Sequence, residues 1–286
     1  MGSYFLGWFD VLRDAYAKFN RDDGWAIASH VALSSLFALF PFLIFATSIA
    51  AFFELGGFAD DVVHLIFDYW PAGASAAIAT EVRSILTETR GDFLTLGGLL
   101  TLYFASNGVE ALRVALNRSY RQEDRRPFWL LRLQSFGFVI LSILVLIIIT
   151  LLFVLLPLAW QLVHRYLPDF VSWGDAVWLW RFVVAVTVLV SALTTSHLFL
   201  PAGRRTVRSV LPGVFFTLLC WMAASLAFGW YLEQFANYVS TYAGLAGAMI
   251  GLIFLYLLGL IFIFGAEINA AIGRVGRPGR RGDRQN

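Results

Sequence analysis

The sequence predicts an all-α, polytopic membrane protein with six transmembrane helices, an N-terminal amphipathic interfacial helix and a periplasmic helical hairpin between helices one and two. Of its 286 residues, 59% are hydrophobic and only 14% are charged, against about 25% charged in soluble domains. The mean hydropathy is +0.73. The apolar residues form six uncharged blocks, at 24–53, 93–109, 133–163, 182–203, 209–232 and 234–266. All but the second contain the roughly 18 apolar residues that a spanning helix needs.

The distribution of basic residues predicts the orientation of these helices. When the segments between them are assigned to alternate sides, 17 of the 21 Lys and Arg residues fall on the side of the two termini. The other side receives four, and its first loop, 54–92, carries seven acidic residues. Because cytoplasmic loops carry the excess of Lys and Arg in membrane proteins, we expect both termini in the cytoplasm.

The first two predicted helices differ in character. Residues 4–19 place aromatic and apolar side chains on one helical face: Phe5, Trp8, Phe9, Leu12, Tyr16 and Phe19. Charged side chains fall mainly on the opposite face, which is typical of a helix lying in the membrane interface. The next helix, about 26–53, carries His30, Ser34 and Pro41 on one face. Pro41 predicts a kink that frees a backbone carbonyl, and packing and gating both explain such a kink.

Residues 54–92 contain two segments of helical periodicity and predict a hairpin on the periplasmic surface. Asp60, His64 and Asp68 share one helical face there, at a spacing compatible with metal ligands. No further ligand is evident elsewhere in the sequence, so a solvated acidic face is the better interpretation. We expect no metal and no cofactor.

The second apolar block turns polar before it is long enough to cross a bilayer. Residues 93–105 extend about 20 Å as a helix, short of the hydrocarbon core of about 30 Å. Asn107 and Glu110 are therefore expected within the cytoplasmic leaflet, with Arg113 one turn beyond Glu110. A carboxylate at that depth requires a partner or a hydrated cavity.

The remaining helices add packing and polar features. Helix three, about 135–160, is nearly pure Leu, Ile, Val and Phe and is expected to face lipid, and helix four, about 182–200, carries His197 near its cytoplasmic end. Helix six, about 242–271, contains Gly244, Gly247, Gly251, Glu267 and Asn269. The spacing of its glycines favours close helix packing. We expect one membrane domain over 1–272, followed by a basic, disordered tail over 273–286 that meets anionic lipid.

Polar residues from four helices are thus expected at a similar depth. The candidate site consists of Glu110, Asn107, Arg113, His30, Ser34, His197, Glu267 and Asn269. One interpretation is a polar cavity open to the cytoplasm and closed near Pro41, which we favour because intramembrane ionisable groups usually mark function. The other is a structural hydrogen-bond cluster that joins the helices, with Glu110 neutralised by Arg113.

Several motifs occur in the order found in a known family: FALFPF, LTLGGLLTLYFASNGVEALRVALNRSY with RRPFW, LPGVFFTLLCW, and TYAGLAGAMIGLIFLYLLGLIFIFGAEINAA. Together they resemble the YihY/BrkB family of bacterial inner-membrane proteins over nearly the whole chain. The residues that match its recurring motifs are Pro41, Asn117, Tyr120, Pro212, Gly213, Trp221, Tyr242, Leu245, Tyr256, Gly265, Glu267 and Asn269. The chain departs from the family at two places. Residues 242–246 read YAGLA, where the usual pattern is Tyr-Gly-Ser-Leu-Gly, and Phe254 stands where the family often has Trp.

The resemblance implies about six transmembrane helices in a bacterial inner (plasma) membrane, and members that carry ribonuclease or virulence labels without an agreed activity. The residues argue against a nuclease, because the four histidines, His30, His64, His164 and His197, are scattered over both membrane sides. We therefore expect no enzyme and no nucleic-acid partner.

Two functions remain open. The first is a transporter or exporter of an unidentified envelope-related or small-molecule substrate through the polar cavity. The second is a non-transporting membrane scaffold or assembly factor in envelope biogenesis. The expected partners are the lipid bilayer and anionic lipid headgroups at the cytoplasmic face. A homo-oligomer or an envelope protein partner stays an open alternative.

Overall fold

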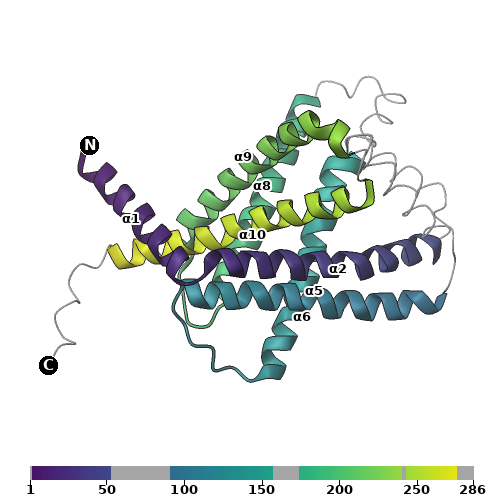
Figure 1. Cartoon of the computed structure of the whole chain (residues 1–286), viewed down its shortest axis with the longest axis horizontal. Helices are drawn as coiled ribbons and strands as arrows, with labels where there is room; N and C mark the ends of the chain where they lie inside the picture. The colour runs from purple at the N-terminus through teal and green to yellow at the C-terminus, as the bar shows by residue number, and fades with distance from the viewer. Residues whose placement is uncertain (1, 53–90, 157–173, 240–242, 276–286) are drawn as a thin grey trace.

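The computed structural model describes residues 2–52, 91–156, 174–239 and 243–275, and in these ranges the regular structure is helical, as predicted (Figure 1). In chain order the elements are α1 (Gly2–Arg21), α2 (Gly24–Phe52), α5 (Gly91–Ser119), α6 (Phe128–Thr150), the π-helical turn η1 (Leu151–Leu155), α8 (Gly174–Phe199), α9 (Val207–Val239) and α10 (Ala243–Val275). The predicted periplasmic hairpin lies almost entirely outside the described residues, as does the tail from residue 276.

The helices pack most closely at the end of the molecule that holds α1. Helices α2 and α5 run side by side, and α10 packs against α2, α9 and α1 (Figure 1). The largest fully buried apolar side chains, Phe19, Leu116, Leu200 and Ile268, come from α1, α5, the segment after α8, and α10. The beginning of α1 and the end of α10 both lie at this end, which we call the core end (Figure 1).

Within the described residues, four helical stretches are long and apolar enough to cross a membrane: Phe128–Phe153, Leu179–Phe199, Val207–Leu232 and Ala248–Arg274. They correspond to the predicted helices three to six. Helix α2 is apolar over Gly24–Leu39, and α5 has the extent expected of helix two but a more polar composition. Along α6, only 6% of the most apolar window is buried. This exposure agrees with the expectation that helix three faces lipid.

Helix α1 packs against α10 through small and β-branched side chains and leaves most of its aromatic face exposed. Val11 and Ala15 pack against Ile268 and Ala271 of α10. The aromatic face that the sequence analysis identified is largely exposed, with Trp8, Phe9, Leu12 and Tyr16 between 41% and 64% accessible. Small and β-branched side chains allow α1 to approach α10, and of the aromatic face only Phe19, at its end, is buried in the core. An exposed aromatic face is what an interfacial helix presents to lipid.

Three element boundaries and features refine the sequence expectations. Helix α6 begins at Phe128, earlier than the predicted start near 135, directly after Pro127 in an extended conformation. Helix α10 continues to Val275, so the predicted domain boundary at residue 272 falls inside a helix. Pro41 lies inside α2 and is buried, and the helix is assigned on both sides of it.

Candidate functional site

The connection between α5 and α6 is organised around one carboxylate, Asp124. Its Oδ2 accepts hydrogen bonds from Arg113 Nη1 at 2.7 Å, from Asn117 Nδ2 at 3.0 Å and from Arg126 Nη2 at 2.7 Å. Its Oδ1 accepts from Arg126 Nε at 2.8 Å. Because Arg126 above all, and then Arg113 and Asn117, stabilise the ionised form, the pKa of Asp124 lies well below its usual range despite partial burial. We call Arg113, Asn117, Asp124 and Arg126 the Asp124 clasp.

The Asp124 clasp fastens the α5–α6 connection to the segment that links α8 to α9. Arg126 Nη2 donates to the carbonyl oxygen of Leu200 at 3.0 Å, and the backbone N–H of Ala202 donates to Asn117 Oδ1 at 2.7 Å. Gln134 of α6 donates to the carbonyl oxygen of Phe199. The last carbonyls of a helix have no partner inside it, so these bonds satisfy the end of α8 and join two distant loops.

Glu110 and Asn107 of α5 each pair with an arginine. Glu110 Oε1 accepts a hydrogen bond from Arg113, its side chain is 32% exposed, and its Oε2 has no hydrogen-bond partner among the described residues. Asn107 Oδ1 accepts from Arg132 Nη1 of α6 at 2.8 Å. The Arg132 guanidinium lies 4.8 Å from the centre of the Tyr103 ring. These contacts connect Glu110 to the Asp124 clasp and Asn107 to α6.

A second polar cluster surrounds Tyr120, the residue after α5, and comprises Tyr120, His197, Arg205 and Asn269. We call it the Tyr120 core. The Tyr120 hydroxyl lies 2.8 Å from His197 Nδ1 and accepts a hydrogen bond from Asn269 Nδ2 at 3.3 Å. Burial raises the pKa of Tyr120 to about 12, against the opposing effects of Asn269 and Arg205.

The Tyr120 core depends on a close approach of α9 to α10. A Cβ at Gly213 would lie 2.1 Å from the carbonyl oxygen of Gly265, so only glycine fits there. The approach brings the Gly213 N–H to Asn269 Oδ1 at 2.6 Å. The close packing predicted for the glycines at the start of α10 is not seen at Gly251, where a Cβ would meet no described atom within 4 Å. The surroundings of 244 and 247 lie outside the described part.

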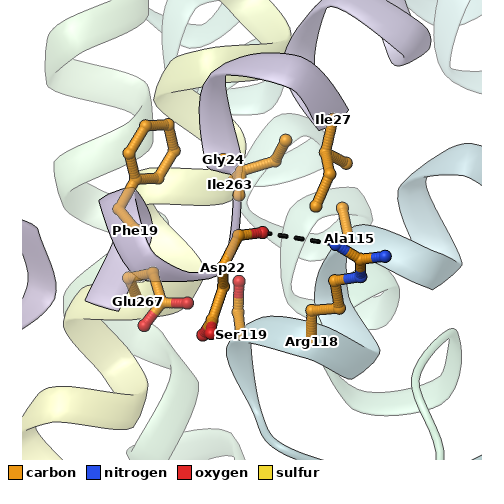
Figure 2. Close-up of a pocket in the computed structure, with 9 residues that line it drawn as sticks. All are labelled: Phe19, Asp22, Gly24, Ile27, Ala115, Arg118, Ser119, Ile263 and Glu267. Carbon is orange, nitrogen blue, oxygen red and sulfur yellow. Dashed lines mark hydrogen bonds between the residues drawn. The ribbon is translucent and has the colours of Figure 1, made fainter. Parts of the chain in front are cut away.

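A third polar group surrounds a small hollow at the core end, which is too narrow to hold a water molecule (Figure 2). Its lining residues come from α1, α2, α5, α10 and the α1–α2 turn: Phe19, Asp22, Gly24, Ile27, Ala115, Arg118, Ser119, Ile263 and Glu267. Glu267 is 1% exposed, is hydrogen-bonded to Ser119, and has Arg274 Nη2 at 3.6 Å. Its Oε2 has no hydrogen-bond partner in the described part of the chain. Figure 2 shows its carboxylate on the same side of the hollow as that of Asp22.

The structure places six of the eight predicted site residues in these groups and leaves His30 and Ser34 outside them. Glu110 and Arg113 adjoin Asp124, Asn107 binds Arg132, and His197 and Asn269 meet at Tyr120. Glu267 is the member of the set that lines the hollow. His30 is exposed on α2, and Ser34 is half-buried one turn further along.

The residues at the centres of the clusters were not among the candidates for the site. Asn117, Tyr120, Gly213 and Gly265 appeared only as matches to family motifs, and they are the residues that the buried contacts now explain. The sequence did not single out Asp124, because it lies in the segment RQEDRR, where all six residues are polar and five are charged. Within the described residues, no group of three or more His, Cys, Asp or Glu is arranged to hold a metal ion.

Apolar helices of membrane-spanning length, joined at one end by buried polar clusters, define a polytopic α-helical membrane protein. The chain belongs to the BrkB family: the family model described as "Virulence factor BrkB" matches residues 15–286. It is 32% identical over 265 residues to the "Putative ribonuclease-like protein YfkH" of Bacillus subtilis (strain 168), covering 91% of this chain and 94% of that protein.

Other relatives are described only as membrane proteins. The chain is 28% identical to a UPF0761 membrane protein of Rhodospirillum centenum, covering 92% of this chain but 57% of the relative. It is 25% identical to one of Pseudoalteromonas atlantica, covering 93% of this chain and 90% of the relative. The chain thus spans little more than half the length of some relatives. No solved structure matches it.

Proposed function

We propose that this protein is a transporter or exporter of an unidentified envelope-related or small-molecule substrate, located in the bacterial inner membrane with both termini in the cytoplasm. The observation that carries the proposal is Glu267, a carboxylate that is 1% exposed within the candidate span Ala248–Arg274 and lines a polar hollow. An ionisable side chain inside a span costs roughly 2.5–3.5 kcal/mol at the helix centre on insertion scales and usually marks a substrate or ion pathway.

The buried carboxylate of Glu267 replaces that of Glu110 as the group on which the proposed function rests. Glu110 is paired with Arg113, which in turn binds Asp124, so these groups hold the loops together. Glu267 differs from Glu110 in burial: its residue is 1% exposed, whereas the Glu110 side chain is 32% exposed. Intramembrane carboxylates that lack a full set of protein partners are suited to bind an ion or a substrate transiently.

The test compares the release of small molecules by cells. A strain without the protein would be complemented with the wild type, Glu267→Gln, or Glu123→Gln, each at equal abundance in the membrane. Glu123 is a suitable control because its side chain is 83% exposed and pairs with an exposed arginine. We expect at least one compound to accumulate inside cells that lack the protein or carry Glu267→Gln, and not in the other two. Identical internal and external compound profiles in all four strains would contradict the proposal.

The topology is tested separately by labelling with a membrane-impermeant thiol reagent. Arg204 lies exposed between α8 and α9, and the chain has one cysteine, Cys220, which is removed by Cys220→Ala. In that background we expect Arg204→Cys to react only after the cells are permeabilised. Labelling of intact cells would place this loop, and with it the termini, outside the cytoplasm.

A non-transporting scaffold in envelope biogenesis is the second candidate. It is favoured by the Asp124 clasp, in which polar side chains near the membrane serve to join loops. If the protein is a scaffold, Glu267→Gln should restore the strain that lacks the protein as fully as the wild type does, at equal abundance in the membrane. It also predicts that an envelope protein is cross-linked to the exposed helix faces in living cells.

We also propose that the protein does not cleave RNA, although one relative is named ribonuclease-like. Hydrolysis by two metal ions needs several carboxylate or His ligands around ions about 4 Å apart. The purified protein is expected to leave RNA intact with and without divalent metal. Cleavage that co-purifies with the protein and disappears in Glu267→Gln would contradict this.

Lipid is the proposed partner at the core end. The exposed aromatic face of α1 would lie among headgroups and acyl chains, and the exposed Arg204 and Arg208 would face anionic headgroups. The protein can be extracted from native membranes in nanodiscs, and the lipid that co-purifies with it can then be analysed. We expect this lipid to be enriched in anionic species relative to the bulk membrane. Lipid composition equal to that of the bulk membrane would contradict this preference.

A further inference from the structure

Arg132 is the charged side chain of an otherwise uncharged membrane span. The candidate span Phe128–Phe153 contains no other Asp, Glu, Lys or Arg. Arg132 Nη1 donates to Asn107 Oδ1 at 2.8 Å, and the guanidinium lies 4.8 Å from the centre of the Tyr103 ring and 5.6 Å from that of Phe136. An amide and two aromatic rings therefore hold this half-buried cation in a defined position between α5 and α6.

The positive charge of Arg132 is not neutralised within the described part of the chain. No carboxylate there forms an ion pair with it, because those of Glu110 and Asp124 pair with Arg113 and Arg126 instead. Asn107 is neutral and accepts a hydrogen bond from one of the several N–H donors of the guanidinium. Charged side chains in membrane spans usually pair with an opposite charge. Arg132 therefore has both the charge and the free donors to bind an anion.

An exposed apolar stripe begins beside Arg132 and follows one face of α6. Its members recur at helical spacing and are between 45% and 67% exposed: Trp129, Leu133, Ile140, Leu144 and Ile147. Between residues 133 and 144 the stripe extends about 16 Å, close to half of the roughly 30 Å hydrocarbon core. A cation at the head of an apolar stripe one leaflet long matches the phosphate and the acyl chain of a lipid. A free anion would use the cation alone.

The charge of the site selects among lipids. A guanidinium binds phosphate oxygens through paired, charge-assisted hydrogen bonds. In a zwitterionic lipid the ammonium group of the headgroup offsets the phosphate charge, whereas phosphatidylglycerol keeps a net negative charge. Glu110 is on the same helix as Asn107 and would repel an anion, but its carboxylate is compensated by Arg113. An anionic lipid is therefore the ligand that leaves the least charge unpaired.

We propose that Arg132, positioned by Asn107, Tyr103 and Phe136, binds the phosphate of one anionic phospholipid whose acyl chain lies along the exposed stripe of α6. The site belongs to α5 and α6, and it is separate from the general contact of α1 and of the α8–α9 segment with lipid. It requires neither a transported substrate nor a particular orientation of the protein in the membrane.

The test uses two phospholipid probes that carry a photoactivatable diazirine in the acyl chain. One is phosphatidylglycerol and the other is phosphatidylcholine. Each is added at a low fraction to phosphatidylcholine nanodiscs that contain the purified full chain, and cross-linked peptides are identified by mass spectrometry. We expect the phosphatidylglycerol probe to label residues 133–144 about tenfold more than the phosphatidylcholine probe, as one charge-assisted hydrogen-bonded contact predicts.

Two substitutions should remove this preference in different ways. Arg132→Gln removes the cation, and Asn107→Asp keeps Arg132 but gives it a carboxylate partner at the position of the amide. In both variants the two probes should label residues 133–144 equally. Arg125→Gln is the matched control, because it removes one positive charge from the α5–α6 connection at a side chain that is 88% exposed. It should keep the preference of the wild type.

Four results would overturn the proposal. The first is equal labelling of residues 133–144 by the two probes in the wild type. The second is an unchanged preference in Asn107→Asp, a comparison that remains informative if Arg132→Gln does not fold. The third is loss of the preference in Arg125→Gln as well, which would show general attraction of anionic lipid to basic side chains. The fourth is loss of the preference on addition of millimolar glycerol phosphate, which would identify a site for soluble anions. The nanodiscs hold no transported compound, so failure here is distinct from failure of the cellular release assay.

Discussion

The substitution Asp124→Asn tests whether the Asp124 clasp holds the core end together. Asparagine keeps the size of the side chain and removes the charge that three side chains contact. Arg113 is 7% exposed, so it would lose one of its two carboxylate partners in a nearly buried position. Breaking a buried ion pair from one side costs roughly 3–5 kcal/mol because a charge is left uncompensated.

The expected loss lies at the lower end of that range, because part of the clasp survives the substitution. Arg113 keeps Glu110 as a partner, and Arg126 is 26% exposed and still reaches the carbonyl oxygen of Leu200. We therefore expect the free energy of unfolding to fall by about 3 kcal/mol. Denaturant unfolding of the purified protein in detergent, followed by tryptophan fluorescence, measures this change.

A control in the same loop makes the result specific. Glu123→Gln removes the adjacent carboxylate, whose ion pair with Arg125 is more than 80% exposed on both sides. Exposed pairs contribute about 0–1 kcal/mol, so this variant should unfold like the wild type. Equal losses in both variants, or a loss below about 0.5 kcal/mol in Asp124→Asn, would refute the role of the Asp124 clasp.

The difference in stability between the wild type and Asp124→Asn should depend on pH, and the direction of this dependence follows from the pKa of Asp124. Arg126 and its neighbours lower the pKa of Asp124 in the folded state, so the ionised carboxylate stabilises the fold. This stabilisation is fully present above the unfolded-state pKa of about 3.9 and is lost as the pH falls toward the lower folded-state pKa. The difference in stability between the wild type and Asp124→Asn should therefore narrow below about pH 4. A difference that is constant down to the acid limit would contradict this account.

Four further substitutions, one of them a control, test the other contacts. Gly213→Ala places a Cβ against backbone and should cost about 3 kcal/mol, whereas Gly251→Ala meets open space and should not destabilise. Tyr120→Phe removes a hydroxyl with two buried partners and should cost about 1–3 kcal/mol in the same unfolding assay. Asp14→Asn breaks a half-exposed pair with Arg274, which should change global stability by less than about 1 kcal/mol but speed amide exchange in α1.

Composition predicted the helical architecture because it depends on single-residue properties summed over long segments. The helices expected from the apolar blocks are present in the described residues, and α5 continues from its apolar half through Glu110 to Ser119 as one helix. The position of polar residues at one end of the bundle was also predictable, because depth along a helix follows from residue number. The partners of those residues do not follow from depth.

The identity of the polar clusters depends on loops and on contacts between distant elements. Asp124 binds three side chains because the α5–α6 connection turns back over α5, at Arg121 with φ of 55°. Periodicity does not predict such a turn. The close contact of Gly213 with Gly265 likewise requires knowing which faces of α9 and α10 meet. The regular glycine spacing at the start of α10 was the stronger pattern, yet Gly251 faces open space.

The Asp124 clasp and the Tyr120 core also determine which wall of the hollow beside Glu267 is able to move. One wall is formed by α5 and α10, which the Asp124 clasp and the Tyr120 core fix to α8 and α9 through buried hydrogen bonds. The opposite wall is the end of α1 with the α1–α2 turn. Two ion pairs hold it, Asp14 with Arg274 and Asp22 with Arg121, and both are partly exposed. Partly exposed pairs contribute little to stability, whereas buried hydrogen bonds are costly to break. Access of water to Glu267 should therefore be governed by displacement of α1, the helix that also presents its aromatic face to lipid, and not by separation of the helices that cross the membrane.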